Sequence, residues 1–210
     1  MTLNEAQRHL DIFLRDVLST LDFQRSELLI YSRLKNEATA SLAFPCRINA
    51  TGICYFRCNV WLRFESLEHL LRGVAAKPSL PTIAMPLHLL DENRNFKEWQ
   101  FNTPDDLMNL REIILNKLRN WVQPFIEQYS TLSELHSKLE SANPMDWFIL
   151  DPEQRVNVLA VIQFVQGDMA AALKTLDNAL LERTAALPKK RLPIEAVRKR
   201  LMEINKQDKH

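Results

Sequence analysis

The stretch ICYFRCNVWLRF, residues 53–64, carries an apolar side chain at every even position from Cys54 to Phe64. An alternation with a period of two predicts a β-strand that buries one face. Residues 38–48 alternate with the same parity. We therefore expect these two segments to pair as an antiparallel hairpin whose even-numbered residues share one core.

The loop between these strands must keep both apolar faces on the same side. A two-residue turn at positions 50–51 would pair even with odd residues and expose one apolar face. A three-residue loop over 50–52 restores the parity and places Gly52 in the left-handed position of a bulged turn. The predicted cross-strand partners are Ile48 with Cys54, Cys46 with Phe56, Phe44 with Cys58, and Leu42 with Val60.

The spacing of Cys54 and Cys58 raises the question of a metal or redox site. Four residues of an extended strand separate their Cα atoms by roughly 13 Å. That separation is too long for a shared zinc ion or for a disulfide. We expect all three cysteines, including Cys46, to be small hydrophobic core residues, and we expect neither a metal nor a cofactor.

The odd-numbered face of the same strand is rich in aromatic and arginine side chains, which are enriched at interface hot spots. Two interpretations stay open: this face binds a partner protein, or the C-terminal helices of the chain cover it. The candidate partner-binding residues are Arg47, Tyr55, Arg57, Asn59, Trp61 and Arg63, together with Trp99 in a polar loop predicted over 91–102.

The rest of the first 144 residues predicts an α+β domain, an antiparallel meander sheet packed by helices. Apolar periodicity predicts a helix over 4–20, and residues 23–34 are expected to form one strand. Pro86 limits residues 81–90 to an edge strand. Thr103, followed by Pro104, is expected to cap a long helix. Pro124 is expected to end or kink that helix, and Thr131 is expected to cap the next one.

Residues 145–210 predict an all-α extension, a helical hairpin that turns at Gly167 followed by a basic helix over 194–205. The hairpin over 159–182 resembles one tetratricopeptide unit, whereas a solenoid needs about three. After Leu187 the chain has eight basic and three acidic residues. The basic run at 188–191 is either a patch for nucleic acid or a membrane surface, or a solvated linker.

Composition excludes several functional classes. Only three glycines are present, so neither a Walker loop nor a dinucleotide fingerprint can form. Lys and Arg total 27 against 26 Asp and Glu, a balance that argues against a nucleic-acid partner. The N-terminus lacks the apolar run of a signal peptide, and no segment is long enough to span a membrane. We therefore expect a cytoplasmic protein with no membrane or nucleic-acid partner.

Residues from about 16 to 140 resemble a small bacterial α+β domain family whose members recur among cytoplasmic immunity proteins of polymorphic and contact-dependent toxin systems. The shared features are a leading helix that ends near LDF (21–23), a strand like RINATGICYF (47–56), a Trp-bearing loop, and the pattern W-x-x-P-F-x-x-x-Y, formed here by Trp121, Pro124, Phe125 and Tyr129. The chain departs from the family at Asp22, where the family has glycine.

This resemblance implies a non-catalytic protein that binds and neutralises a cognate toxin domain. Two other functions stay open: an adaptor or chaperone built on the tetratricopeptide-like hairpin, and an enzyme without a recognisable motif. The sequence does not specify an oligomeric state.

Overall fold

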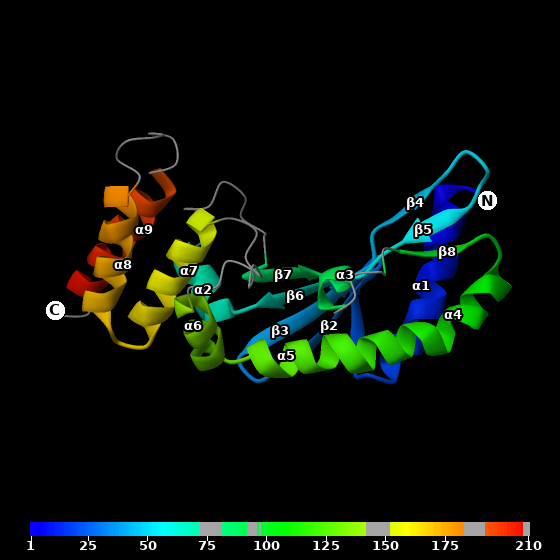
Figure 1. Cartoon of the computed structure of the whole chain (residues 1–210), viewed down its shortest axis with the longest axis horizontal. Coiled ribbons are helices and arrows are strands. Elements are labelled where there is room, and N and C mark those ends of the chain that lie inside the picture. Colours follow the sequence, from blue (N-terminus) through cyan, green and yellow to red (C-terminus); the bar gives the residue numbers. More distant parts are fainter. Residues whose placement is uncertain (72–80, 92–95, 97, 142–151, 183–191, 208–210) are drawn as a thin grey trace. The chain divides into compact units, whose positions relative to one another are not determined.

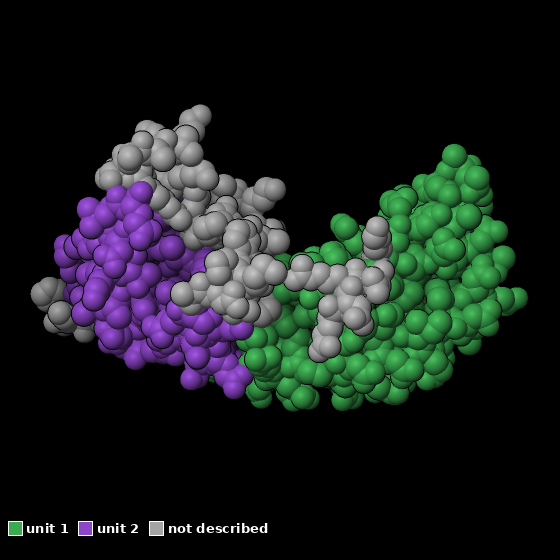
Figure 2. Space-filling view, in the orientation of Figure 1, with its two compact units in different colours: residues 1–62, 84–130 green, residues 63–83, 131–210 purple. Residues whose placement is uncertain are grey.

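The computed structural model describes residues 1–71, 81–91, 96, 98–141, 152–182 and 192–207 (Figure 1). The chain forms two compact units, which Figure 2 colours separately: residues 1–62 with 84–130, and residues 63–83 with 131–210. This division differs from the boundary expected after residue 144, because residues 63–83 and the chain from residue 131 onward belong to the same unit as the C-terminal helices. The basic run at 188–191 lies outside the described residues.

The described strands form two sheets. The larger sheet has the strand order β1-β2-β3-β6-β7, and the smaller one has the order β4-β5-β8. The predicted α+β class with an antiparallel sheet is therefore confirmed. The strand bounds are β1 Gln24–Glu27, β2 Ile30–Lys35, β3 Ala38–Ala43, β4 Cys46–Ile48, β5 Cys54–Phe56, β6 Asn59–Arg63, β7 Ile83–Pro86 and β8 Trp99–Phe101.

Helices α1, α4 and α6 each begin at a threonine whose hydroxyl accepts a hydrogen bond from the first turn. The Thr103 hydroxyl accepts from the backbone N–H of Asp106, whose carboxylate accepts from the N–H of Thr103. The helix bounds are α1 Leu3–Ser19, α2 Glu65–Leu71, α3 Leu87–Leu90, α4 Pro104–Lys117, η1 Leu118–Val122, α5 Gln123–Tyr129, α6 Leu132–Glu140, α7 Pro152–Val165, α8 Met169–Glu182 and α9 Leu192–Gln207.

The single strand expected over 23–34 is wrong, because the structure has a hairpin of β1 and β2 there. Leu29 forms the turn with φ of 58°, a left-handed conformation that leucine rarely adopts. Two adjacent leucines, Leu28 and Leu29, occupy the position where glycine or asparagine usually signals such a turn. The sequence pattern therefore hid the turn.

The two long strands expected over 38–48 and 53–64 are each divided between the two sheets. Phe44 and Pro45 separate β3 from β4, and Arg57 and Cys58 separate β5 from β6. Pro45 has no N–H for a strand ladder, while its carbonyl accepts from the N–H of Arg57 at 3.2 Å. The alternation therefore continues through a point where the chain passes from one sheet to the other.

The predicted loop and register between β4 and β5 are confirmed. Ile48 pairs with Cys54, Cys46 pairs with Phe56, and Gly52 has φ of 82°. The Asn49 side chain stabilises the loop by accepting from the N–H groups at positions 51 and 53. The other two predicted pairs, Phe44 with Cys58 and Leu42 with Val60, would connect the β3 and β6 segments. These two strands are neighbours in the larger sheet, and both pairs stay predictions.

Three further expectations need correction. Residues 81–90 form the edge strand β7 and then the short helix α3, rather than one strand. Trp99 lies in β8 and not in a loop. Of the two outcomes expected at Pro124, an end to the helix is wrong, since α4, the π-helical turn η1 and α5 run on as one long helix (Figure 1), while a kink stays a prediction. The wider turn lets the N–H of Gln123 bond the carbonyl of Leu118, and Pro124, which has no N–H, occupies the first turn of α5.

The unit formed by 63–83 and 131–210 has a helical core. The predicted hairpin is confirmed: α7 and α8 pack together around Gly167, which has φ of 90°. Within this unit, α7 also contacts α2, α6 and α9. The buried side chains of α8 and α9 include Leu176, Ala179, Ile194, Val197 and Leu201.

Candidate functional site

The two faces of the five-stranded sheet differ sharply in burial. On the inner face the side chains of Tyr31, Ala40, Leu42, Val60 and Leu62 are fully buried. Helix α1 lies on this side, because the Tyr31 hydroxyl bonds to Asp11 of α1. The opposite side is here called the outer face, and its members are Gln24, Ser26, Glu27, Ile30, Ser32, Leu34, Thr39, Ser41, Ala43, Asn59 and Trp61.

The middle of the outer face is a row of hydroxyl groups. The Ser32 hydroxyl lies 3.1 Å from the Ser26 hydroxyl and 2.7 Å from that of Ser41, so one chain of hydrogen bonds crosses three strands. These side chains are small, and none carries a charge. Leu34, farther along the same face, is 78% exposed. The outer face is therefore uncharged at its centre and has exposed apolar side chains beside it.

A mainly apolar groove of about 350 Å³, here called the Trp61 groove, lies at one end of the outer face. The β1–β2 turn, the bend between β3 and β4, strand β6 and one residue of α1 all contribute to its walls. Leu28 in this groove is 51% exposed, and Trp61 is half-buried. Its lining residues include Gln7, Leu28, Ile30, Phe44, Asn59 and Trp61.

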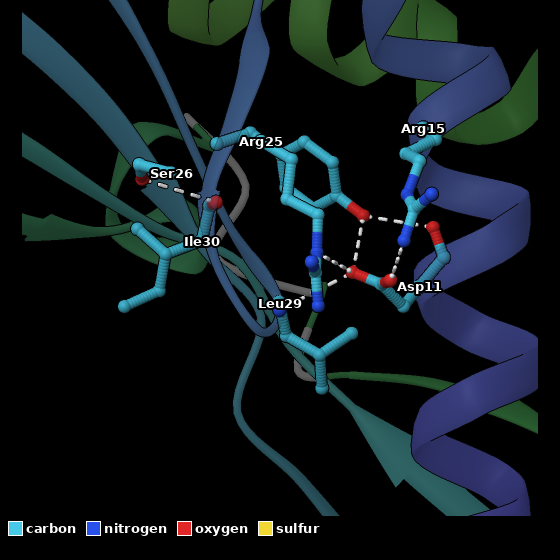
Figure 3. Close-up of polar contacts among 7 residues, drawn as sticks. Asp11, Arg15, Arg25, Ser26, Leu29 and Ile30 are labelled. Atoms are coloured by element: carbon cyan, nitrogen blue, oxygen red, sulfur yellow. Dashed lines mark hydrogen bonds and ion pairs between the residues drawn. The ribbon is translucent and has the colours of Figure 1, made fainter.

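A buried carboxylate holds the turn that forms one wall of this groove (Figure 3). One oxygen of Asp11, Oδ1, accepts from Arg25 Nε at 3.0 Å, from the Tyr31 hydroxyl at 2.8 Å and from the Leu29 N–H at 3.5 Å. The other oxygen, Oδ2, accepts from Arg15 at 2.7 Å. Asp11 thus ties α1 to both strands of the hairpin and to its turn.

The charge state of Asp11 follows from these contacts. Burial by itself would raise the pKa of the carboxyl, but the hydrogen bonds from Arg15, Tyr31, Arg25 and Leu29 outweigh it and hold the pKa below its ordinary value. Burial, followed by the bond to Asp11, raises the pKa of Tyr31. Asp11 therefore stays ionised and Tyr31 stays a hydrogen-bond donor at neutral pH.

The predicted partner-binding residues fall into separate places. Arg47 and Tyr55 lie on the three-stranded sheet and interact with their own neighbours. The Arg47 guanidinium lies 4.5 Å from the centre of the Tyr55 ring and 2.6 Å from a Glu98 carboxylate oxygen. The Tyr55 hydroxyl also accepts from the Asn49 side chain at 3.5 Å. These four residues are here called the Arg47 cluster.

Trp99 is not on the surface with this cluster. It pairs with Phe56 across β5 and β8, and it is only 4% exposed. Its ring centre lies 5.3 Å from that of Phe56 and 4.6 Å from that of Phe96. Trp99 therefore belongs to the core of the small sheet, on the face opposite Tyr55, and it offers no aromatic surface to a partner.

The remaining predicted residues follow the outer face. Asn59 and Trp61 line the groove. Arg63 forms an ion pair with Glu68 at 2.7 Å. Arg57 is exposed, and no ion pair is found for it among the described residues. Asn59 and Trp61 therefore line the Trp61 groove, Arg57 lies between β5 and β6 and is not among the lining residues, and none of these residues belongs to the Arg47 cluster.

The cysteines show burial rather than reactivity. Cys54 and Cys58 are buried as expected, but the expectation is wrong for Cys46, which is partly exposed and lines the Trp61 groove. Burial raises the pKa of all three thiols, that of Cys54 to about 12. In the described part of the chain no cluster of three or more His, Cys, Asp or Glu side chains is placed to hold a metal ion. Nor does any described helix combine the length and apolar character needed to cross a membrane.

Sequence reasoning missed the residues that build the groove. Leu28 and Leu29 were placed inside one strand, and Asp11 was not considered. The available signal was the break in alternation at Leu28–Leu29, where two large apolar side chains follow one another. No protein-family model, no curated protein and no solved structure matches this chain.

Proposed function

We propose that this chain is a non-catalytic immunity protein of the bacterial cytoplasm, which binds a cognate toxin domain through the outer face of its five-stranded sheet. The observation that carries this proposal is the Trp61 groove. Trp61 and Leu28 are large apolar side chains that stay partly in contact with water, although neighbouring side chains on the inner face are fully buried. Burying them against a partner is favourable, and tryptophan is enriched among interface hot spots.

The conformation of Asp22 supports the resemblance on which the toxin partner rests. Asp22 has φ of 61°, in the left-handed region that glycine adopts without strain. The resembling family has glycine at this position. The departure therefore changes the residue type while the backbone keeps a geometry that glycine would favour.

The test is co-expression of the chain with each product of the genes beside its own, scoring cell survival and co-purification. The expected result is that one neighbour is toxic alone, is tolerated with this chain, and purifies with it as a complex. Trp61→Ala should abolish or strongly weaken that protection. The proposal fails if no neighbouring product is both toxic and neutralised.

The adaptor alternative has one supporting observation, the α7–α8 hairpin with its glycine turn. In this structure, however, α7 already contacts α2, α6, α8 and α9 within its own unit. An adaptor would be recognised by several clients in a pull-down, each lost when exposed side chains of α8 are changed and none lost in Trp61→Ala. The same pair of variants therefore separates the two functions.

A further inference from the structure

We infer that strand β2 binds an extended segment of a partner protein, which adds a β-strand beside Leu34 and buries an apolar side chain against it. The site is a hollow of about 490 Å³, here called the Leu34 notch. Asp22 and Gln24 line one side of it, and residues 32–35 with Thr39 line the rest. The notch shares no lining residue with the Trp61 groove, so this inference does not rest on the proposed function.

The notch exists because β1 is shorter than β2. Strand β1 pairs only with residues 30–32 of β2, and it begins at Gln24. The backbone before Gln24 belongs to the end of α1, where the N–H groups of Asp22 and Phe23 donate to helix carbonyls at 3.2 and 3.1 Å. Residues 33–35, roughly 10 Å of extended chain, therefore have β3 on one side and no described strand on the other.

The hydrogen-bond pattern of the β2–β3 hairpin leaves both backbone groups of Leu34 free. Lys35 and Ala38 close a two-residue turn, and the pair that closes such a turn exchanges hydrogen bonds. Bonded and non-bonded pairs alternate along an antiparallel ladder, so the next pair, Leu34 with Thr39, is non-bonded. The N–H and the carbonyl of Leu34 therefore point away from β3, toward the notch, and no described residue bonds either of them.

The side chain of Leu34 selects an apolar neighbour. It is 78% exposed on the outer face. The Arg33 side chain is held on the other face, where Nη1 donates to the Leu21 carbonyl at 2.8 Å and the guanidinium lies 4.5 Å from the centre of the Phe23 ring. Opposite residues of an antiparallel pair have their side chains on the same face. A partner residue that exchanges both backbone bonds with Leu34 therefore places its own side chain against it, and burial favours an apolar one.

These features fit an extended peptide better than other occupants. A free N–H and a free carbonyl on one strand edge need a donor and an acceptor at strand spacing, which a peptide backbone supplies. Charges of both signs border the notch, Asp22 and Lys35, so charge does not select the segment. A second copy paired two-fold about Leu34 would place its turn residue Asn36 in the position that Gln24 already occupies.

The experiment uses the full-length chain as bait for a displayed library of random twelve-residue peptides. Peptides are selected on the wild type and counter-selected on Leu34→Pro, which removes the N–H that faces the notch and leaves the bonds to β3 in place. Leu34→Ala is the matched control, because it removes the side chain and keeps the N–H. Trp61→Ala shows whether a peptide occupies the Trp61 groove instead. Circular dichroism and thermal unfolding establish that each variant is folded.

The expected affinities follow from the two contacts. Selected peptides should bind Leu34→Ala about three-fold more weakly than the wild type, and Leu34→Pro about ten-fold more weakly than Leu34→Ala, because proline both removes the donor and obstructs the edge. Trp61→Ala should leave their affinity unchanged. Fluorescence anisotropy gives these dissociation constants.

A scan of N-methylated peptides on the wild type tests strand pairing from the side of the ligand. Methylation of the residue opposite Leu34 should weaken binding about ten-fold or more, because its N–H donates to β2. Methylation of either neighbouring residue should change affinity less than about three-fold, because those N–H groups point away from β2. Amide hydrogen exchange of the free chain should be faster at Leu34 than at Arg33 and Lys35, and the peptide should slow it.

Four results would overturn the inference. Slow exchange at Leu34 in the dilute free chain would refute the free edge, and slow exchange that appears only at high protein concentration would assign the edge to a second copy. Peptides that bind the wild type and Leu34→Pro equally, or a methylation scan without alternation, would refute strand addition. The scan and the exchange measurement use the wild type alone, so both decide the inference even if Leu34→Pro does not fold.

Discussion

The Arg47 cluster and the Trp61 groove show how two similar sequence patterns give opposite surfaces. Both combine an aromatic ring with arginines at odd positions of residues 47–63. In the Arg47 cluster the guanidinium lies over the Tyr55 ring and pairs with Glu98, so its polar groups are satisfied within the chain. In the Trp61 groove the aromatic ring borders a hollow, and Arg57, between β5 and β6, has no ion-pair partner among the described residues.

This difference indicates that residue type alone does not mark a binding surface. An aromatic–arginine pair that is already complete gains little when a partner arrives, because its contacts must be exchanged rather than added. An aromatic side chain beside an empty groove gains new contacts and loses water on binding. The groove is therefore the better candidate, even though the Arg47 cluster has the more conspicuous composition.

The largest expected effect tests the two regions directly. With the toxin partner identified by co-expression, Trp61→Ala should weaken binding about 30-fold or more, the loss of a hot-spot residue. Tyr55→Ala should weaken it less than about five-fold, because that ring is engaged within its own cluster. Isothermal titration calorimetry gives both dissociation constants. Equal losses of affinity for Trp61→Ala and Tyr55→Ala would contradict the view that the Trp61 groove, and not the Arg47 cluster, binds the partner.

The second prediction concerns the support of the groove. Asp11→Ala removes the acceptor shared by Arg25, Tyr31 and the Leu29 N–H, and it should lower the free energy of unfolding by about 1–3 kcal/mol. Urea unfolding measures this change. Amide hydrogen exchange should accelerate at Leu29 and stay unchanged at Tyr55. Faster exchange at both would mean that the hairpin and the small sheet respond as one element.

The third prediction concerns the pH dependence of the stabilisation that Asp11 contributes. Because the pKa of Asp11 is lowered in the folded state, its stabilisation is complete above the unfolded value of about 3.9, and it is lost as pH falls through the folded pKa. The stability difference between wild type and Asp11→Asn should therefore be constant from pH 7 to about 5 and should shrink toward pH 3. A difference that grows on acidification would show the opposite pKa shift.

The smallest expected effect comes from the Arg47 cluster. Glu98→Gln removes a surface ion pair in which the Arg47 side chain is 62% exposed, so it should cost less than about 1 kcal/mol. The stability difference between wild type and Glu98→Gln should decrease further in high salt, because salt screens exposed ion pairs. Urea unfolding at low and high salt measures it, and partner binding should not change. A large loss of partner binding would place the Arg47 cluster inside the interface.

Local patterns in the sequence predicted much of this fold. The capping residues Thr103 and Thr131, the glycine turns and the α7–α8 hairpin follow from interactions within a few residues, and each is confirmed. The β4–β5 register was predicted because parity and a three-residue loop leave only one arrangement that buries both apolar faces. The β1–β2 turn was missed because leucine seldom occupies a left-handed position.

The candidate site was predicted only in part, because its residues come from distant segments. Asn59 and Trp61 were identified from the parity of one strand. Gln7, Leu28 and Phe44 were not, since nothing in local sequence places α1, the β1–β2 turn and the β3–β4 bend around the same hollow. Trp99 was misplaced for a related reason, because its neighbours in sequence are polar and its neighbours in space are aromatic.

By itself, the sequence determined which side chains of residues 38–64 are apolar and which are polar, and therefore which of them share a face. Alternation is a local property, so it survives even where the chain passes from one sheet to the other. Only the tertiary structure decided which exposed side chains are satisfied by the chain itself. That outcome depends on long-range neighbours: Glu98 reaches Arg47, whereas Arg57 has no such partner among the described residues.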